Sequence, residues 1–374
     1  MRKISTLAAV GGLALSLALA GCGSSSNDTA TQPPTTTTSD NSAASPSDTG
    51  SASAAAKQYP KFKACMVSDT GGFNDHSFNE TSLAGMMEAG QQYGVQTSKL
   101  QSNADSDYTT NLATLAKQGC NEITSVGFLL ADATLAAAKK NPNIDYGIID
   151  NPYGKAIPSN LKELLFATDQ AAFLGGYLAA GMTHSGTIGT MGGVEIPSVT
   201  IYMDGFLKGI QQYNKDNGKD VKLLGWDGKK GAFSNDFGDV SKCKSIAQTQ
   251  IQQGADIEFP VAGGCGEGAL QAAKAAGDLA IWVDTDGYVS EPDYKDILLA
   301  SVMKRVDSAT IAGIVDAASG KWSNKPYMGT LSNQGVALSP YHDFDSKIPQ
   351  ALKDKITSYQ QQIEANPKAF GLSG

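Results

Sequence analysis

From Tyr59 onward, short apolar runs alternate with longer amphipathic segments, and this rhythm limits the fold more than any other feature of the sequence. Apolar runs of strand length separated by helix-length spacers are typical of a parallel sheet covered by helices on both faces. The first series predicts strands at 62–68, 95–101, 123–128, 144–150 and 164–168, with helices at 76–93, 107–118 and 131–140. The rhythm then restarts and predicts strands at 186–191, 221–226, 257–261, 279–284 and 297–301, with helices at 170–182, 199–213, 237–253, 267–276 and 304–319.

The restart of the rhythm predicts an α/β protein with two doubly wound units in tandem. A chain of 374 residues is long enough for two domains, each with a core of its own. Ligands of such sheets bind beyond the carboxyl ends of the strands. The cleft between the two units is therefore the expected binding site.

The N-terminus has the layout of an export signal. Arg2 and Lys3 precede an apolar stretch at 7–20, which is too short and wrongly flanked to span a membrane. The following Leu-Ala-Gly-Cys, ending at Cys22, resembles a bacterial lipobox, in which cleavage leaves the cysteine first and diacylglycerol is attached to its sulfur. We predict a lipoprotein signal peptide at 1–21; an ordinary signal peptide followed by an incidental cysteine is the alternative.

The segment after Cys22 is nearly devoid of residues that could build a core. Residues 23–56 are almost entirely Ser, Thr, Ala, Asp, Asn, Gly and Pro. Such a composition cannot offset the entropy lost on folding. We therefore predict that 22–58 is a lipidated, disordered tether that places the folded body on the outer side of the cell membrane.

The charge of the chain excludes one class of function, and its cysteines limit the possible disulfides. The formal net charge is −8 and the chain has no basic cluster, which excludes a typical nucleic-acid-binding protein. Of five cysteines, lipidation of Cys22 leaves four thiols outside the cytoplasm, and four allow three disulfide pairings.

Carboxylates stand where three of the predicted strands end. Asp69 follows the first strand, and Asp150 and Asp284 each end a later one. Any one of them could simply cap a helix or begin a turn. Three at equivalent strand ends favour a polar site at the predicted cleft.

The segment 67–79, Val-Ser-Asp-Thr-Gly-Gly-Phe-Asn-Asp-His-Ser-Phe-Asn, is the most distinctive stretch of the chain. A Gly-Gly loop between a strand and a helix lets the backbone approach a ligand closely. Asp75 or Ser77 could cap the helix. Phe78 offers a flat apolar face and Asn79 both a donor and an acceptor, although Phe78 could equally belong to the core.

This segment resembles the opening motif Asp-x-Gly-Gly-x-x-Asp-(Lys/Arg)-Ser-Phe-Asn of the basic membrane protein family, the purine-nucleoside-receptor type of ABC-transporter substrate-binding lipoprotein. His76 stands where Lys or Arg is usual. The resemblance covers roughly residues 61–340. Further matches to the family follow in order at 146–150, 173–180, 189–193, 204–209, 237–244, 283–287 and 301–307.

The resemblance implies a type I periplasmic-binding-protein fold, in which three crossovers join two α/β lobes near Thr168, near Ser301 and near 327–331. The implied lobes are 59–168 with 302–328, and 169–301 with 329–374. It also implies a monomeric receptor without a cofactor or enzymatic activity. The receptor would close around a nucleoside and deliver it to an ABC-transporter permease.

Family members that bind nucleosides clamp the base between two phenylalanine rings, one from each lobe. The matching positions here are Phe78 and Phe237, with Phe233 as a rival because the loop before it is hard to align. For the polar contacts the resemblance implies two sets. Acceptors for the base edge would be Asp150, Asp69 and Asn79. Groups that hold the ribose would be Asp284 or Asp286, Lys304 and backbone near Gly263 and Gly264.

For the disulfides we prefer Cys65–Cys120 and Cys243–Cys265, one in each lobe. Cys65 lies in the first predicted strand and Cys120 just before the third, and these strands are neighbours in a sheet of order 2-1-3.

Other functions remain as alternatives. The same fold could bind a sugar or a signalling molecule, and the lipoprotein could act in signalling or adhesion without transport. Gly264-x-Gly266-x-x-Ala269, with Asp284 ending the next strand, also fits the dinucleotide fingerprint of an exported NAD-dependent oxidoreductase. No metal site is predicted, because the three histidines are widely separated and 284–287 lacks the later ligands of a calcium loop.

Overall fold

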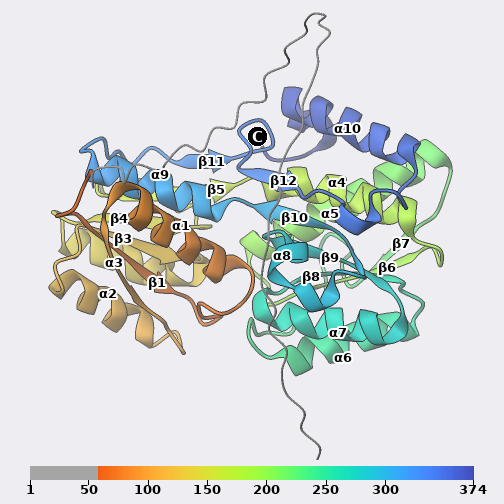
Figure 1. Cartoon of the computed structure of the whole chain (residues 1–374), viewed down its shortest axis with the longest axis horizontal. Helices are drawn as coiled ribbons and strands as arrows, with labels where there is room; N and C mark the ends of the chain where they lie inside the picture. Colours follow the sequence, from red (N-terminus) through yellow and green to blue (C-terminus); the bar gives the residue numbers. More distant parts are fainter. Residues whose placement is uncertain (1–57) are drawn as a thin grey trace, which may run out of the picture. The chain divides into compact units, whose positions relative to one another are not determined.

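The computed structural model describes residues 58–374. In this range the chain forms two six-stranded sheets, each with helices on both faces (Figure 1). None of the helices described is both long enough and apolar enough to cross a membrane. The predicted signal peptide, Cys22 and the tether up to residue 57 lie outside the described residues.

The first sheet is entirely parallel. Its strand order is β11 (Tyr327–Gly329), β5 (Leu161–Phe166), β4 (Asp145–Ile149), β3 (Glu122–Val126), β1 (Lys63–Ser68) and β2 (Gln96–Leu100). The predicted 2-1-3 order of the first three strands is confirmed. The second sheet is parallel except for its first strand, which runs antiparallel to its neighbour. Its order is β12 (Val336–Leu338), β10 (Leu298–Lys304), β9 (Leu279–Asp284), β8 (Ile257–Val261), β6 (Thr187–Gly192) and β7 (Lys222–Leu224).

Helices cover both faces because both faces of the central strands are apolar. In β1, Ala64 and Met66 belong to a different core cluster from Cys65 and Val67. Over the first sheet pack α1 (Phe78–Tyr93), α9 (Val306–Ala318), α2 (Asp107–Lys117) and α3 (Ala131–Lys140). Over the second pack α4 (Thr168–Met182), α5 (Pro197–Asn217), α10 (Gln350–Ala365), α6 (Val240–Gln252) and α7 (Glu267–Ala276).

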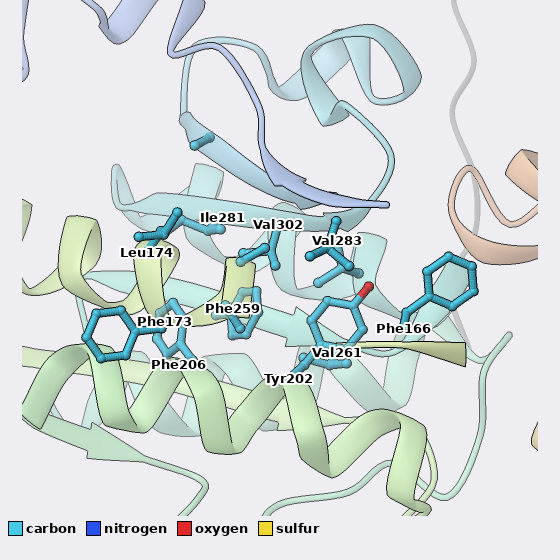
Figure 2. Close-up of a cluster of buried hydrophobic side chains, with 14 of the residues drawn as sticks. Phe166, Phe173, Leu174, Tyr202, Phe206, Phe259, Val261, Ile281, Val283 and Val302 are labelled. Carbon is cyan, nitrogen blue, oxygen red and sulfur yellow. The ribbon is translucent and has the colours of Figure 1, made fainter. Parts of the chain in front are cut away.

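The largest core cluster includes α4, α5 and the neighbouring strands of the second sheet (Figure 2). The Phe206 ring of α5 stacks on Phe259 of β8 with 4.2 Å between centroids. The two helices approach closely because glycines face backbone: a Cβ on Gly176 would overlap the carbonyl oxygen of Phe206, and one on Gly209 that of Phe173. Each large side chain buried here contributes roughly 1.5–3 kcal/mol.

The chain passes between the sheets three times, after β5, after β10 and after β11. Below, the first lobe means residues 58–167 with 305–329, and the second lobe means 168–304 with 330–374. The middle crossing falls three residues beyond the predicted boundary, because β10 stays paired with β12 as far as Lys304. The last falls one residue later, because Gly329 is still paired with β5.

Both predicted disulfides are present. Cys65 of β1 is bonded to Cys120, with 6.0 Å between Cα atoms, and Cys243 of α6 is bonded to Cys265, with 5.6 Å. Each bond lies within one lobe. The first closes the longer loop, since its cysteines are 55 residues apart and those of the second only 22.

Several elements differ from expectation. The helix predicted from residue 237 begins at Val240, because the Asp239 side chain accepts a hydrogen bond from the backbone of Ser241 and caps it. The strands β11 and β12 are not predicted, because three residues are too few to show a period. α10 is not predicted either, although its buried residues have helical spacing: Leu352, Ile356, Tyr359 and Ile363.

Candidate functional site

A cavity lies between the two lobes at the carboxyl ends of their strands. Both sheets contribute polar and aromatic groups to its wall. The lining residues are Asp69, Asp75, Phe78, Asn79, Gly127, Phe128, Asp150, Ile196, Ser198, Val199, Tyr202, Phe237, Val261, Ala262, Gly263, Asp284 and Lys304.

Asp69 follows β1, and groups of its own lobe hold its carboxylate. Its Oδ1 accepts hydrogen bonds from Asn79 Nδ2 and from the backbone N–H of Gly71, both at 2.9 Å. A Cβ on Gly127 would lie 2.7 Å from Oδ2, so a glycine is needed there. Burial raises the pKa of Asp69 to about 6, against the two hydrogen bonds. At neutral pH, Asp69 is therefore mostly an ionised acceptor at the wall of the cavity.

Asp75, rather than Ser77, caps α1. Its carboxylate accepts hydrogen bonds from the backbone N–H groups of Ser77, Asn79 and Glu80 at 2.8–3.1 Å. Burial raises the pKa of Asp75 to about 6, and these bonds oppose the rise. Asp75 thereby fixes the start of the helix that carries Phe78 and Asn79 into the cavity.

Lys304 ends β10 and joins the acids of the two lobes. Only 3% of its side chain is exposed, and its Nζ lies 2.5 Å from Asp150 Oδ2 and 3.9 Å from Asp284 Oδ1. Burial raises the pKa of Asp150, while the Lys304 ammonium opposes that rise. Asp150 and Asp284 both have left-handed backbones, with φ of 71° and 66°. Such conformations in non-glycine residues are concentrated at functional positions.

Two hydroxyl groups orient Asp284. Tyr202 donates to Oδ1 and Ser77 donates to Oδ2, each at 2.7 Å. Tyr202 comes from α5 of the same lobe, whereas Ser77 comes from the first lobe. Burial and the neighbouring Asp284 raise the pKa of Tyr202, so its hydroxyl remains a donor at neutral pH.

Four aromatic side chains line the cavity, and two of them are predicted, one from each lobe: Phe78 at the start of α1 and Phe237 before α6. The Lys304 ammonium lies 4.6 Å from the centroid of the Phe78 ring. Phe233 lies elsewhere, because its ring packs edge-on against Trp226 at 6.1 Å. Of the two rival phenylalanines, only Phe237 lines the cavity.

Comparison with known proteins assigns this architecture to a family. The family model described as "ABC transporter substrate-binding protein PnrA-like" matches residues 62–369. The chain belongs to this family.

Relatives and solved structures agree with that assignment. The "ABC transporter nucleoside-binding protein BmpA" of Lactococcus lactis subsp. cremoris is 31% identical over 308 residues, covering 77% of this chain and 84% of that protein. "Basic membrane protein B" of Borreliella burgdorferi is 33% identical over 258 residues, covering 67% and 71%. A solute-binding protein of an ABC transporter from Aeropyrum pernix K1 has the same fold, with a TM-score of 0.74 and 22% identity over 82% of this chain and 92% of that one.

Members of the PnrA-like family are substrate-binding proteins of ABC transporters and not enzymes. The interpretation of Gly264-x-Gly266 as a dinucleotide fingerprint is therefore wrong. The structure gives these glycines another use. A Cβ on Gly266 would lie 3.1 Å from the Trp282 ring, and Gly264 lies beside Asp75 of the opposite lobe.

Two predicted site residues do not line this cavity. Gly264 lines a second cavity, and its place in the main wall is taken by Gly263. Asp286 faces away, because its Oδ2 lies 2.8 Å from His342 Nε2 and its Oδ1 accepts the backbone N–H of Tyr288 to cap the short helix α8 (Gly287–Ser290). The other predicted residues, Asp69, Phe78, Asn79, Asp150, Phe237, Asp284 and Lys304, are brought together.

Sequence reasoning misses several members of the wall. Tyr202, Ser198 and Val199 belong to α5, and Phe128 follows β3. Tyr202 is buried and has the spacing of a core residue, so only the fold reveals that its hydroxyl reaches Asp284. Among residues 58–374, no group of three or more His, Cys, Asp or Glu side chains is arranged to hold a metal ion.

Proposed function

We propose that the protein is a membrane-anchored receptor that binds purine or related nucleosides in the interlobe cavity and delivers them to an ABC importer. The observation that carries this proposal is that Phe78 and Phe237 line one cavity from opposite lobes. Stacking on an aromatic ring contributes roughly 1–3 kcal/mol per base. A ring system held between the two side chains gains this energy only when the lobes are closed.

The polar groups of the cavity match the two ends of a nucleoside. Asp69, Asn79 and Asp150 can accept and donate hydrogen bonds along the edge of a base. Asp284 and Lys304 can bind vicinal hydroxyls of a ribose, with backbone at Gly263 nearby. In this assignment Gly263 replaces Gly264, and Asp284 is preferred to Asp286.

The charge of the cavity favours an uncharged ligand. Asp69, Asp75, Asp150 and Asp284 face it together with one cation, Lys304. A phosphate would be repelled by the carboxylates, so a nucleoside fits better than a nucleotide. The Lactococcus lactis relative, 31% identical, is named as a nucleoside-binding protein, which supports the same ligand class.

Binding experiments with the full chain test this proposal. Guanosine, adenosine and inosine should each raise the melting temperature, whereas ribose, glucose, NAD and GMP should not. A ligand at 100 times its Kd stabilises the native state by about 2.7 kcal/mol. The matched variant Phe237→Ala should lose the shift and Phe233→Ala should keep it. The absence of a shift with every nucleoside would contradict the proposal.

We further propose that Cys22 carries the lipid anchor, that 22–58 is the tether, and that the monomeric closed form docks on a permease through both lobes. The support is the resemblance of the N-terminus to a lipobox. Acyl chains anchor by roughly 0.8 kcal/mol per buried CH₂ group. The variant Cys22→Ala should move the protein from the membrane fraction into the medium or periplasm. Retention of the variant in the membrane would exclude this anchor.

A further inference from the structure

Three contacts join the segment before α1 to the end of β9 and the residues after it, across the two lobes. Ser77 Oγ donates to Asp284 Oδ2 at 2.7 Å, Trp282 Nε1 donates to the carbonyl of His76 at 3.3 Å, and His76 Nδ1 lies 3.4 Å from Glu291 Oε1. We call these five residues the clasp. None of them belongs to the segments at which the chain crosses between the lobes.

The first-lobe half of the clasp is held rigidly. The Asp75 carboxylate binds the backbone of Ser77, and the backbone N–H of His76 donates to Glu80 Oε2 at 3.1 Å. His76 has a left-handed backbone, with φ of 51°. This conformation is unfavourable for a residue with a Cβ, and where it persists it points to a functional position. Here it presents both the carbonyl and the imidazole of His76 to the second lobe.

The second-lobe half of the clasp reaches the ligand cavity through Asp284. One of the two hydroxyls that orient this carboxylate, that of Tyr202, belongs to the same lobe. The other, that of Ser77, is present only while the lobes are together. Opening the cleft therefore removes a charge-assisted hydrogen bond and frees one oxygen of Asp284 to turn away.

Glu291 lies at the outer end of the clasp in an acidic environment. It is 5% exposed, and besides His76 the charged groups that act on it are Glu80 of α1, Glu267 of α7 and Asp293 of the turn that follows. Burial raises the pKa of Glu291 to about 7; His76 opposes this rise and the three carboxylates add to it. His76 is thus the group of the first lobe that offsets the acidic surroundings of Glu291.

We propose that the clasp makes ligand retention depend on closure: Ser77 is a positioning residue that orients Asp284 for the nucleoside only in the closed state, and the contact between His76 and Glu291 holds that state. The proposal rests on the proposed function for the identity of the ligand. It adds two residues, Ser77 and Glu291, that make contacts between the lobes. The rate of ligand release should depend on both.

The clasp also links closure to pH. When the lobes separate, Glu291 regains water and its pKa returns toward the ordinary value near 4.5. The closed state, with the raised pKa, is favoured while Glu291 is protonated. This advantage is lost as the pH rises through about 7. Above pH 6.5, Asp69 and Asp75 are mostly ionised, so the window from pH 6.5 to 8.5 separates the titration of Glu291 from that of these two carboxyls.

Stopped-flow kinetics with inosine on the full chain test the role of Ser77, with fluorescence of Trp282 as a reporter at the clasp. Loss of a hydrogen bond to a charged group should raise koff by about tenfold or more in Ser77→Ala and change kon little. Ser77→Thr, which keeps the hydroxyl, should restore the slow release. Thr114→Ala, which removes a hydroxyl bonded only within its own helix, is the control. An unchanged koff in Ser77→Ala would overturn the positioning role.

Calorimetry from pH 6.5 to 8.5 tests the role of Glu291. The Kd for inosine should rise by about fourfold over this range in the wild type and in Ser77→Ala, and stay level in Glu291→Gln. A slope that persists in Glu291→Gln would overturn the link to pH. Circular dichroism of each variant checks that it is folded.

The failure of this proposal can be told from failure of the proposed function. If the wild type binds no nucleoside, the proposed function fails, and the clasp is tested without a ligand. Small-angle X-ray scattering should then show a larger radius of gyration for the double variant Ser77→Ala, Glu291→Gln than for the wild type at pH 6.5. Equal radii would overturn the clasp itself.

Discussion

The two halves of the cavity hold their carboxylates in different ways. In the first lobe, Asp69 is bound by Asn79 and Gly71 of the same lobe. In the second lobe, Asp284 is bound by Tyr202 of its own lobe and by Ser77 of the other. Asp69 is therefore held before the lobes meet. Asp284 gains a partner on closure, and so does Asp150 of the first lobe, which pairs with Lys304 of the second. In a substrate-binding protein, this difference lets a ligand be recognised in the open state and retained in the closed one.

The largest expected effects come from removing the disulfide of each lobe, which compares the stability of the two lobes. Removing a disulfide increases the entropy of the unfolded chain and so lowers the free energy of unfolding. The expected loss is about 4 kcal/mol for the 55-residue separation and about 3 kcal/mol for the 22-residue one. We therefore expect a larger loss of stability in the double variant Cys65→Ala, Cys120→Ala than in the double variant Cys243→Ala, Cys265→Ala. Urea unfolding at fixed pH measures both. A smaller loss for the first pair would show that the second lobe depends more on its cross-link.

Intermediate effects compare the two aromatic walls. Phe78→Ala and Phe237→Ala should each weaken nucleoside binding by about 1–3 kcal/mol, or roughly 5- to 150-fold. If the part of the cavity around Asp69 is preformed, Phe78→Ala should lower kon as well as raise koff, whereas Phe237→Ala should mainly raise koff. Phe233→Ala, which alters the packing on Trp226, should change stability and not affinity. Equal changes in kon and koff for the two cavity variants would contradict the proposed difference between the lobes.

The smallest effect concerns the preformed carboxylate. With the pKa of Asp69 raised to about 6, the acceptor is lost by protonation below that pH, and nucleoside affinity should fall by about tenfold per pH unit. The same raised pKa favours the native state while Asp69 is protonated, so stability without ligand should decrease as the pH rises through 6. Calorimetric titrations from pH 5 to 7 compare the wild type with Asp69→Asn. The variant should bind weakly with a flatter profile, and an unaltered profile would assign the titration to Asp75.

Much of the fold could be predicted because its signal is local. The alternation of apolar runs and helix-length spacers predicts most strands and helices, and the predicted 2-1-3 order places Cys65 and Cys120 on neighbouring strands. Residues after 319 were harder to assign. There, β11 and β12 are held by pairing with distant strands, since three residues have no stable structure alone.

Site residues that belong to a sequence motif could be predicted. Site residues that only the packing of the helices and strands brings to the cavity could not. Phe78 and Asn79 follow from the motif at 67–79, and Asp150 and Asp284 from strand ends. Tyr202 is missed because a buried tyrosine on an amphipathic helix looks like any other core residue. Asp286 comes just after the strand that Asp284 ends, and only its contact with His342 shows that it does not line the cavity.

The sequence by itself determined most helices and strands, the two-lobed α/β class and the family resemblance, because each depends on residues that are close in the chain. The tertiary structure decided which groups meet. Phe237 rather than Phe233 faces the cavity, Gly263 rather than Gly264 lines it, and Ser77 reaches Asp284 across 207 residues of sequence. Contacts between the lobes depend on the tertiary structure because their partners are far apart in the chain. No local sequence pattern indicates that such residues will meet.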